Sequence, residues 1–229
     1  GMRRASLKEI ERSIPFVDCR SAIFSACTAI IDTGEYMQVL NGLLFQRGAH
    51  LVTECRACGF GESAVYTDRG EIECDIAVNA AGLYCDELAL AAGIEGYEVR
   101  PLKGDYYVTR SLSLRVPVYP VPNHTHKTLG VHLTPTFGSE VMIGPSEWPS
   151  SGRDNYLIET PRPVFEESLK SMIRADAYNT MEIYEGFAGN RPRAYFHGER
   201  CDDFVIIRKP DWVIHLIAFE SPGLTSAPA

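Results

Sequence analysis

The chain has 229 residues, 45% of them hydrophobic and 23% charged, which is the balance of a globular protein with a real core. A formal net charge of −8 and scattered Arg and Lys residues argue against nucleic acid as the main partner. No apolar run approaches the roughly 20 residues that a membrane span needs, and no secretory h-region is present.

The seven cysteines follow no regular spacing, so we expect reduced thiols and a cytoplasmic protein. Cys55 and Cys58 have CxxC spacing, but they lie inside a strand-like run rather than at a helix start, which favours a structural role. His124 and His126 form the other metal-like pair. They sit in a polar stretch, and we expect no metal site.

The first third of the chain is predicted to contain two helices and a small sheet. Residues 3–12 are charged and helix-compatible, and Pro15 ends that stretch. A second helix with one apolar face is predicted to begin at Thr33 and to end near Gly48. Three strand-like runs follow and predict a short antiparallel meander over residues 51–60, 63–67 and 71–74.

Residues 76–82, Ile-Ala-Val-Asn-Ala-Ala-Gly, form a different kind of strand, because the run is continuously apolar. This pattern predicts a strand buried on both faces of a parallel sheet, followed by a helix over 83–92 that Gly93 stops. Small residues at the carboxyl end of such a strand allow the backbone to approach a flat or phosphorylated ligand. Tight strand–helix packing explains the same residues equally well.

From residue 97 onward the pattern becomes antiparallel β, with Pro, Gly and polar turns between the runs. Strands are predicted over 106–109, 116–119, 130–134 and 140–144, a helix over 161–175, and strands over 203–208 and 212–219. The fold class predicted from this order is α+β with an α/β remnant.

Four short segments, taken in this order, carry a family resemblance: 79–82, 101–107, 189–192 and 221–225. The set resembles the FAD-dependent oxidoreductases of the D-amino-acid oxidase superfamily. Within it, the L-2-hydroxyglutarate oxidase/dehydrogenase branch is the most similar, on the runs 119–122, 129–134, 143–145 and 220–225. The resemblance covers the chain from about residue 22 onward.

The resemblance implies an antiparallel-sheet substrate domain plus part of a Rossmann-like FAD-binding domain. It places a partial FAD-binding domain at 1–96, the substrate domain at 97–185, and a C-terminal hairpin that returns to the FAD site at 186–229. The family's GxGxxG turn, which holds the FAD pyrophosphate, is not found in this sequence. We therefore expect a trimmed piece of a longer protein, a degenerate gene, or a nucleotide-binding segment encoded elsewhere.

The cofactor contacts implied by the resemblance come from small residues and backbone. Ala57 would lie beside the adenine, and Ala81 and Gly82 near the ribose and phosphates. The pyrimidine edge of the flavin would face backbone N–H groups of the C-terminal segment, which stabilise negative charge on the reduced ring. The residues expected there are Pro222, Gly223, Leu224 and Thr225.

Arg191 matches the arginine of a Gly-x-Arg-Pro motif that holds the substrate carboxylate, a role suited to a bidentate guanidinium. Spacing alone favours a surface salt bridge for it. His132 is the candidate base, because imidazole titrates near working pH and its strand neighbours point to the opposite face. A cross-strand packing histidine is the alternative. Lys103 and Tyr107 are expected to line the same cavity as His132.

These resemblances predict an FAD-dependent oxidoreductase that oxidises a small 2-hydroxy acid, L-2-hydroxyglutarate as the best candidate, by hydride transfer to flavin. The expected partner is a small carboxylate substrate, and a homodimer and a peripheral membrane association of the full-length protein stay open. The alternatives are an amine- or glycerol-3-phosphate-oxidising relative and a catalytically dead substrate-binding domain.

Overall fold

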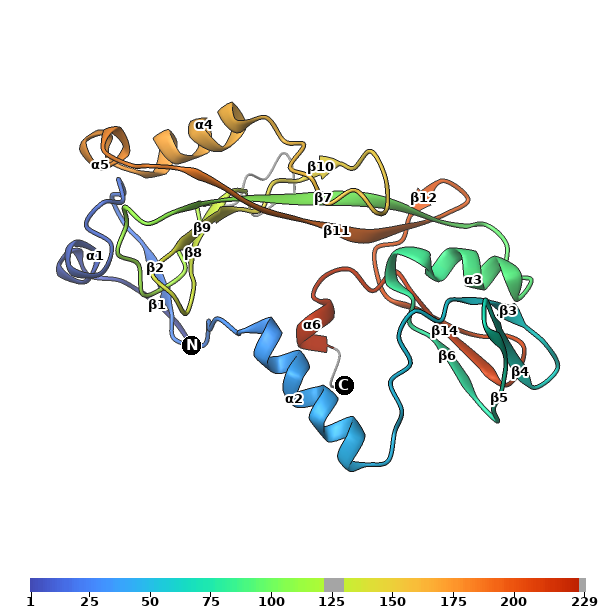
Figure 1. Ribbon diagram of the computed structural model, residues 1–229. Helices are drawn as coiled ribbons and strands as arrows, with labels where there is room; N and C mark the ends of the chain where they lie inside the picture. The colour runs from blue at the N-terminus through green and yellow to red at the C-terminus, as the bar shows by residue number, and fades with distance from the viewer. Residues whose placement is uncertain (122–129, 227–229) are drawn as a thin grey trace. The chain divides into compact units, whose positions relative to one another are not determined.

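The computed structural model describes residues 1–121 and 130–226, so His124 and His126 lie outside the described residues. The chain forms two compact units, each assembled from separate stretches of sequence (Figure 1). Unit 1 comprises Gly1–Gly48, Lys103–Trp148 and Tyr156–Gly189. Unit 2 comprises Ala49–Leu102, Pro149–Asn155 and Asn190–Ala229.

Unit 1 contains a curled antiparallel sheet with the helix α4 (Arg162–Met172) packed on one face. Two long strands, β7 (Tyr97–Thr109) and β11 (Tyr184–Phe196), contribute residues to both units. The sheet order is β12-β11-β7-β9-β8, and β10 pairs with β7. The remaining elements of unit 1 are β1 (Met2–Arg4), α1 (Leu7–Ser13), β2 (Ile23–Ser25), α2 (Thr33–Gln46), β8 (His132–Pro135), β9 (Val141–Gly144), α4 (Arg162–Met172) and α5 (Ala175–Asn179).

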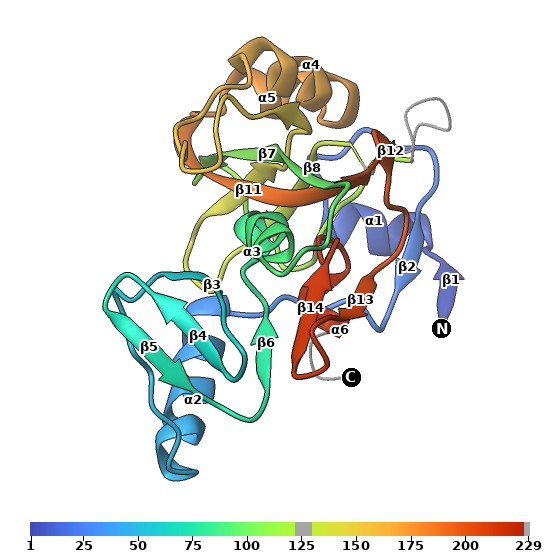
Figure 2. The same cartoon turned by 90° about the vertical axis from the view of Figure 1, so that its right-hand side faces the viewer.

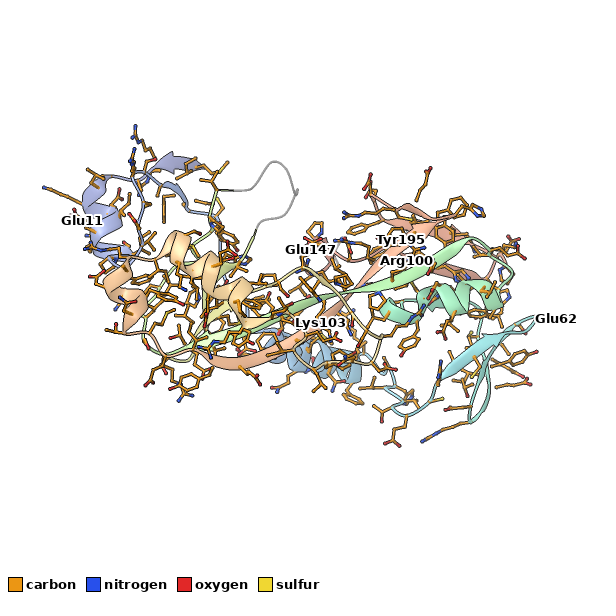
Figure 3. The ribbon with its side chains drawn as sticks, turned by 90° about the horizontal axis from the view of Figure 1, so that it is seen from above. Glu11, Glu62, Arg100, Lys103, Glu147 and Tyr195 are labelled. Carbon is orange, nitrogen blue, oxygen red and sulfur yellow. The ribbon has the colours of Figure 1, made fainter. Side chains whose placement is uncertain are left out.

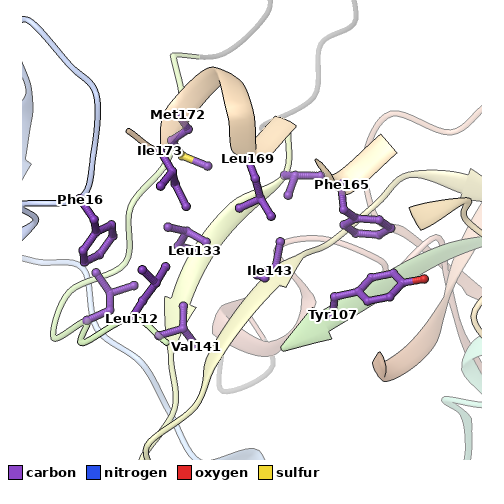
Figure 4. Packing of buried hydrophobic residues seen from close by; sticks show 12 residues of the cluster. Phe16, Tyr107, Leu112, Leu133, Val141, Ile143, Phe165, Leu169, Met172 and Ile173 are labelled. Atoms are coloured by element: carbon purple, nitrogen blue, oxygen red, sulfur yellow. The ribbon is translucent and has the colours of Figure 1, made fainter. Parts of the chain in front are cut away.

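The core of unit 1 lies between α4 and one face of this sheet (Figure 4). Phe165, Leu169 and Met172 recur at helical spacing on α4 and are buried. They meet the sheet residues Leu133 and Ile143, which are fully buried. Because side chains alternate along a strand, this packing decides which residues face away from the core.

Unit 2 contains two small sheets that flank α3 (Figure 2). One is the antiparallel meander β3-β4-β5, and the other has the order β13-β14-β6. Its elements are β3 (Ala57–Phe60), β4 (Ala64–Thr67), β5 (Gly70–Glu73), β6 (Ala77–Asn79), the 3-10 helix η1 (Gly82–Tyr84), α3 (Cys85–Ala91), β12 (Glu199–Arg200), β13 (Val205–Arg208), β14 (Val213–Ile217) and α6 (Gly223–Ser226). Strand β10 (Trp148–Pro149) lies at the junction of the two units in sequence.

Both apolar packing and polar contacts hold α3 in place. Cys85 and Ala89 of α3 pack against Ile217 of β14 in the core of unit 2. Arg153 forms a bidentate ion pair with Asp86, at 2.8 and 2.9 Å, and also donates to the Leu83 carbonyl. Both charged groups are largely buried, so this pair fixes the loop 149–155 to the start of α3.

Several predictions of secondary structure are confirmed. The second helix runs over Thr33–Gln46, although Asp32 rather than Thr33 caps it by accepting from the Glu35 N–H. The meander is present, and all seven cysteines are free thiols. No helix in the described part of the chain is long and apolar enough to cross a bilayer.

Two predictions are wrong, and one long strand was not predicted. The strand around residues 76–82 is not buried on both faces, because Ile76 is 58% and Val78 56% exposed. The expected strand over 116–119 is a single bridge, Val118 to Leu133. The sequence pattern also missed the long strand Tyr184–Phe196, whose glycines and charges weaken the alternation signal.

Candidate functional site

In unit 2, two neighbouring strands end at the same edge of a sheet. Strands β6 and β14 run parallel, with Ala77 opposite Val213 and Asn79 opposite His215. Figure 2 shows the two strands side by side. Their carboxyl ends therefore lead into the turn 80–82 and the segment 218–224 at one edge. Crevices at the carboxyl ends of parallel strands are where α/β folds bind ligands.

Asn79 fixes the turn that follows β6. Its side-chain amide donates to the Cys85 carbonyl at 2.8 Å, and its side-chain oxygen accepts from the Ala81 N–H at 3.2 Å. The residue is 3% exposed. A buried amide with donor and acceptor both used holds the turn in one conformation, which places Ala81 and Gly82 at the strand end.

His215 completes this buried network. Its Nδ1 lies 3.0 Å from the Asn79 amide nitrogen and its Nε2 lies 2.9 Å from the Lys209 carbonyl oxygen. The amide nitrogen only donates and the carbonyl only accepts, so the ring is neutral with its proton on Nε2. Burial lowers the pKa of His215, and the hydrogen bond to Lys209 opposes that shift only in part.

Two glycines at this edge leave space for a ligand. A Cβ at Gly82 or at Gly223 would meet no atom within 4 Å, and Gly82 adopts a φ of 55°. Open space beside backbone at the ends of parallel strands allows close approach of a phosphate or a planar ring. Ala57 lies on β3 of the neighbouring meander and is half-buried.

A three-residue ion cluster anchors the segment that carries Pro222, Gly223, Leu224 and Thr225. Glu220 accepts hydrogen bonds from Arg193, at 3.1–3.3 Å, and from Arg200, at 3.1 Å. The side chains of Arg193 and Glu220 are only 14% and 13% exposed. Phe219 also stacks on Phe204, with centroids 4.3 Å apart. The start of α6 is therefore tied to β11 and β12 by charge and by packing.

Arg191 and Arg193 lie on the same face of β11, but only Arg193 is paired with a carboxylate. Both point to the same face of β11 by alternation, opposite Ala194, which is buried in the core of unit 2. On that face Arg100 lies over the ring of Tyr195 (Figure 3). Arg191 is half-buried, and its side chain forms no ion pair and no hydrogen bond with the described residues. The surface salt bridge that spacing alone favoured is not present there.

The open face of the unit 1 sheet, the one turned away from α4, carries His132. In the register, Tyr107 lies opposite Ile143 and Ile143 lies opposite Leu133, and this row faces the core (Figure 4). The adjacent row runs from His132 to Gly144 and therefore projects to the open face. His132 is half-buried there, on the face opposite Val131 and Leu133, and this orientation is the one that alternation predicted.

Lys103 and Tyr107 do not share that face. Both belong to the buried face of β7, where Tyr107 packs on Phe165 with ring centroids 4.9 Å apart. Lys103 is fully buried and pairs with Glu159 at 2.7 Å (Figure 3). The predicted common cavity with His132 is therefore wrong. Alternation does put both residues on one face of β7, but only the register between strands shows which face meets the core.

The sequence reasoning missed three aromatic residues on the open face. Tyr119 packs on His132, with ring centroids 4.3 Å apart. On the other side of Gly144 the ring of Tyr106 stacks on Phe187 at 4.8 Å, and a Cβ at Gly144 would come within 2.7 Å of it. The signal available in sequence was the Tyr106-Tyr107 pair, of which one residue must face away from the core.

The tautomer of His132 follows from one contact. Its Nδ1 lies 3.0 Å from the Gly130 carbonyl oxygen, which only accepts hydrogen bonds. The proton of the neutral ring therefore resides on Nδ1, and Nε2 keeps the lone pair.

No cluster of His, Cys, Asp and Glu suited to a metal ion occurs within residues 1–121 and 130–226.

Two features, each within one unit, bear on the class of protein. In unit 2 the open glycine positions beyond the ends of β6 and β14 fit the close backbone approach that a dinucleotide needs. In unit 1 a half-buried imidazole lies on an aromatic face. Residues 2–229 match the family model described as FAD dependent oxidoreductase (DAO). The chain belongs to this family of FAD-dependent oxidoreductases.

Individual relatives agree with this assignment. L-2-hydroxyglutarate dehydrogenase from Indibacter alkaliphilus is 26% identical over 274 aligned positions, which cover 99% of this chain and 67% of that protein. Glycerol 3-phosphate dehydrogenase from Caloramator mitchellensis is also 26% identical, but the match covers only 44% of it. L-2-hydroxyglutarate dehydrogenase from Mus musculus is 31% identical over 53% of this chain.

Solved structures show the same fold. Glycine oxidase from Bacillus cereus superimposes with a TM-score of 0.78 at 16% identity, over 99% of this chain and 62% of that one. L-α-glycerophosphate oxidase from Mycoplasma pneumoniae, solved with FAD bound, gives the same TM-score at 22% identity and the same coverage. The chain thus spans about three fifths of the solved relatives, and its architecture is a mixed α/β fold with a curled antiparallel sheet.

His215 makes the stability of unit 2 depend on pH. Its folded-state pKa is lowered, so its contribution is complete above its ordinary pKa and is lost as the pH falls through the folded value. Between pH 7.5 and 5 the free energy of unfolding should fall by up to about 1.4 kcal/mol per pH unit from this residue. Urea unfolding at both pH values measures it. The His215→Gln variant, whose amide retains donor and acceptor, should lose this part of the dependence, and His50→Gln, at an exposed site, should retain it. Equal pH dependence in all three proteins contradicts the assignment.

Glu220→Gln should loosen the C-terminal segment, because the largely buried Arg193 and the half-exposed Arg200 lose their carboxylate. Loss of charge-assisted hydrogen bonds of this kind costs about 2 kcal/mol. Hydrogen–deuterium exchange of the peptide covering residues 218–226 should become faster. Asp202→Asn is the matched control, since Asp202 is 93% exposed and 3.9 Å from Arg200. Unchanged exchange in Glu220→Gln would show that the ion cluster does not anchor the segment.

Proposed function

We propose that this protein oxidises a small 2-hydroxy acid, with L-2-hydroxyglutarate as the substrate. In this proposal His132 serves the substrate, and the edge formed by β6 and β14 is part of a Rossmann-like FAD-binding domain. The observation that carries the proposal is the geometry of His132. The printed names of several relatives, which are L-2-hydroxyglutarate dehydrogenases, favour this substrate.

His132 acts as the general base. The hydrogen bond from Nδ1 to the Gly130 carbonyl leaves the lone pair on Nε2, so the ring accepts a proton at that atom. The base removes the proton of the hydroxyl group on C2 of the substrate. The C2 hydrogen leaves as a hydride, and the C–O bond becomes the C=O bond of a 2-oxo acid. Bound FAD supplies the acceptor for that hydride.

Arg191 binds the substrate carboxylate. A guanidinium holds a carboxylate in a planar, two-point contact, and Arg191 has no competing carboxylate among the described residues. Arg193 is unsuited to this role, because Glu220 already occupies it. The C1 carboxylate is therefore assigned to Arg191 rather than to Arg193.

The cofactor would be held by backbone and small side chains. Ala81 and Gly82 lie at the end of β6, and the backbone from Pro222 to Thr225 enters α6 at the end of β14. Ala57 would lie beside the adenine. The match covers 67% of the Indibacter relative, so this chain represents only part of that protein's length. The activity is therefore proposed for the protein with FAD bound.

The names of other relatives favour glycerol 3-phosphate or an amine as alternative substrates. Two relatives are named as acting on glycerol 3-phosphate, and one solved relative is a glycine oxidase. An arginine that binds a carboxylate also binds a phosphate. A substrate panel therefore belongs in the experiment.

The test is anaerobic reduction of the bound flavin, followed by its absorbance. L-2-hydroxyglutarate should reduce the wild-type protein. His132→Gln should lower kcat by about 10²–10⁴-fold, because the proton acceptor is lost. Arg191→Met should raise KM far more than it changes kcat, and His50→Gln should match the wild type.

Three outcomes would count against the proposal. Normal turnover by His132→Gln would remove the base assignment. Reduction by glycerol 3-phosphate or glycine, with none by L-2-hydroxyglutarate, would replace the substrate class. A protein that takes up no FAD would favour a substrate-binding domain without catalysis.

A further inference from the structure

The open face of the unit 1 sheet contains a contact that the proposed function leaves unused. The ring of Tyr119 packs against the imidazole of His132, with centroids 4.3 Å apart and planes inclined by 30°. Both residues belong to unit 1. The two rings overlap closely enough for the tyrosine to limit how the imidazole turns.

The backbone beside Tyr119 is fixed to the core strand that carries His132. Val118 and Leu133 exchange two backbone hydrogen bonds, of 2.8 and 2.9 Å. Leu133 is fully buried, so this bridge is anchored on the core side of the sheet. In such an antiparallel pair the residues next to the bridge also lie opposite each other, which places Tyr119 opposite His132.

The residue after Tyr119 covers the other partner of the imidazole. Gly130, whose carbonyl oxygen binds Nδ1 of His132, adopts a φ of 68°. A Cβ at that position would lie 3.4 Å from Cγ of Pro120. The segment Tyr119-Pro120 therefore contacts the ring of His132 and closely approaches the glycine that orients it.

An imidazole needs both restraints to present one nitrogen reliably. The terminal torsion of histidine is broad, and a half-turn of the ring would move Nδ1 away from the Gly130 carbonyl. The hydrogen bond to the Gly130 carbonyl lies at a half-exposed site, where it competes with water. Packing of an aromatic ring on the imidazole face resists the rotation without consuming a nitrogen.

We propose that Tyr119 is a positioning residue for His132, whose ring contact keeps Nδ1 on the Gly130 carbonyl and leaves Nε2 as the proton acceptor. The inference deepens the proposed function and rests on His132 being the base. It requires the ring of Tyr119 and not its hydroxyl group. Tyr119→Phe should therefore behave like the wild type, and Tyr119→Leu should not.

The direct test is an NMR measurement of the imidazole nitrogens of His132 in the 229-residue chain, at a pH where the ring is neutral. The wild type and Tyr119→Phe should show one nitrogen protonated and the other bare, with well-separated ¹⁵N shifts. In Tyr119→Leu the two shifts should move towards each other as the tautomers mix. Tyr156→Leu is the control, because Tyr156 is 57% exposed in the same unit. Tyr119→Met is the second variant if the leucine protein does not fold.

A kinetic readout separates positioning from structure. In the FAD-loaded protein, Tyr119→Leu should lower kcat about tenfold and leave KM little changed, because misplacement of a base affects the chemical step. Unchanged ¹⁵N shifts in both Tyr119→Leu and Tyr119→Met would overturn the inference, whatever His132→Gln does. Normal turnover by His132→Gln would instead overturn the base assignment, while the nitrogen signals still report on the ring contact.

Discussion

The alternation of side chains along antiparallel strands is the constraint on which the candidate site depends. Leu133 and Ile143 must face α4 to close the core of unit 1, and this requirement fixes the orientation of every neighbour on their strands. His132 and Gly144 are thereby forced to the open face. A shift of one residue in this register would bury the imidazole and expose the leucine, so the register that closes the core also sets the position of His132.

Unit 2 uses a second constraint, the parallel pairing of β6 with β14. Parallel strands deliver their carboxyl ends to one edge, and each of these strands leads into small residues. Buried polar groups then hold the two segments beyond the strand ends. Asn79 fixes the turn after β6, and Glu220 ties the segment after β14 to β11 and β12. The glycines provide space while charged and amide side chains provide rigidity. This combination suits a site that grips a cofactor through its backbone.

Elements with strong local sequence patterns were predictable, whereas contacts between residues far apart in sequence were not. The helix at Thr33–Gln46 and the meander have strong local patterns, and the orientation of His132 was predictable because its strand neighbours are apolar. The assignment of Lys103 and Tyr107 to the same cavity failed because alternation within one strand does not tell which face meets the core. That information resides in pairings such as Tyr107 with Ile143, between residues far apart in sequence. The polar role of Glu220 was hidden for the same reason, since its partners lie 20 and 27 positions away.

We propose that the open face of the unit 1 sheet receives the substrate and that His132 accepts its proton. A crystal structure of the FAD-loaded protein with L-2-hydroxyglutarate is the decisive measurement. The substrate hydroxyl is expected about 3 Å from Nε2 of His132. A substrate bound elsewhere, or with its hydroxyl group directed away from His132, would exclude His132 as the base.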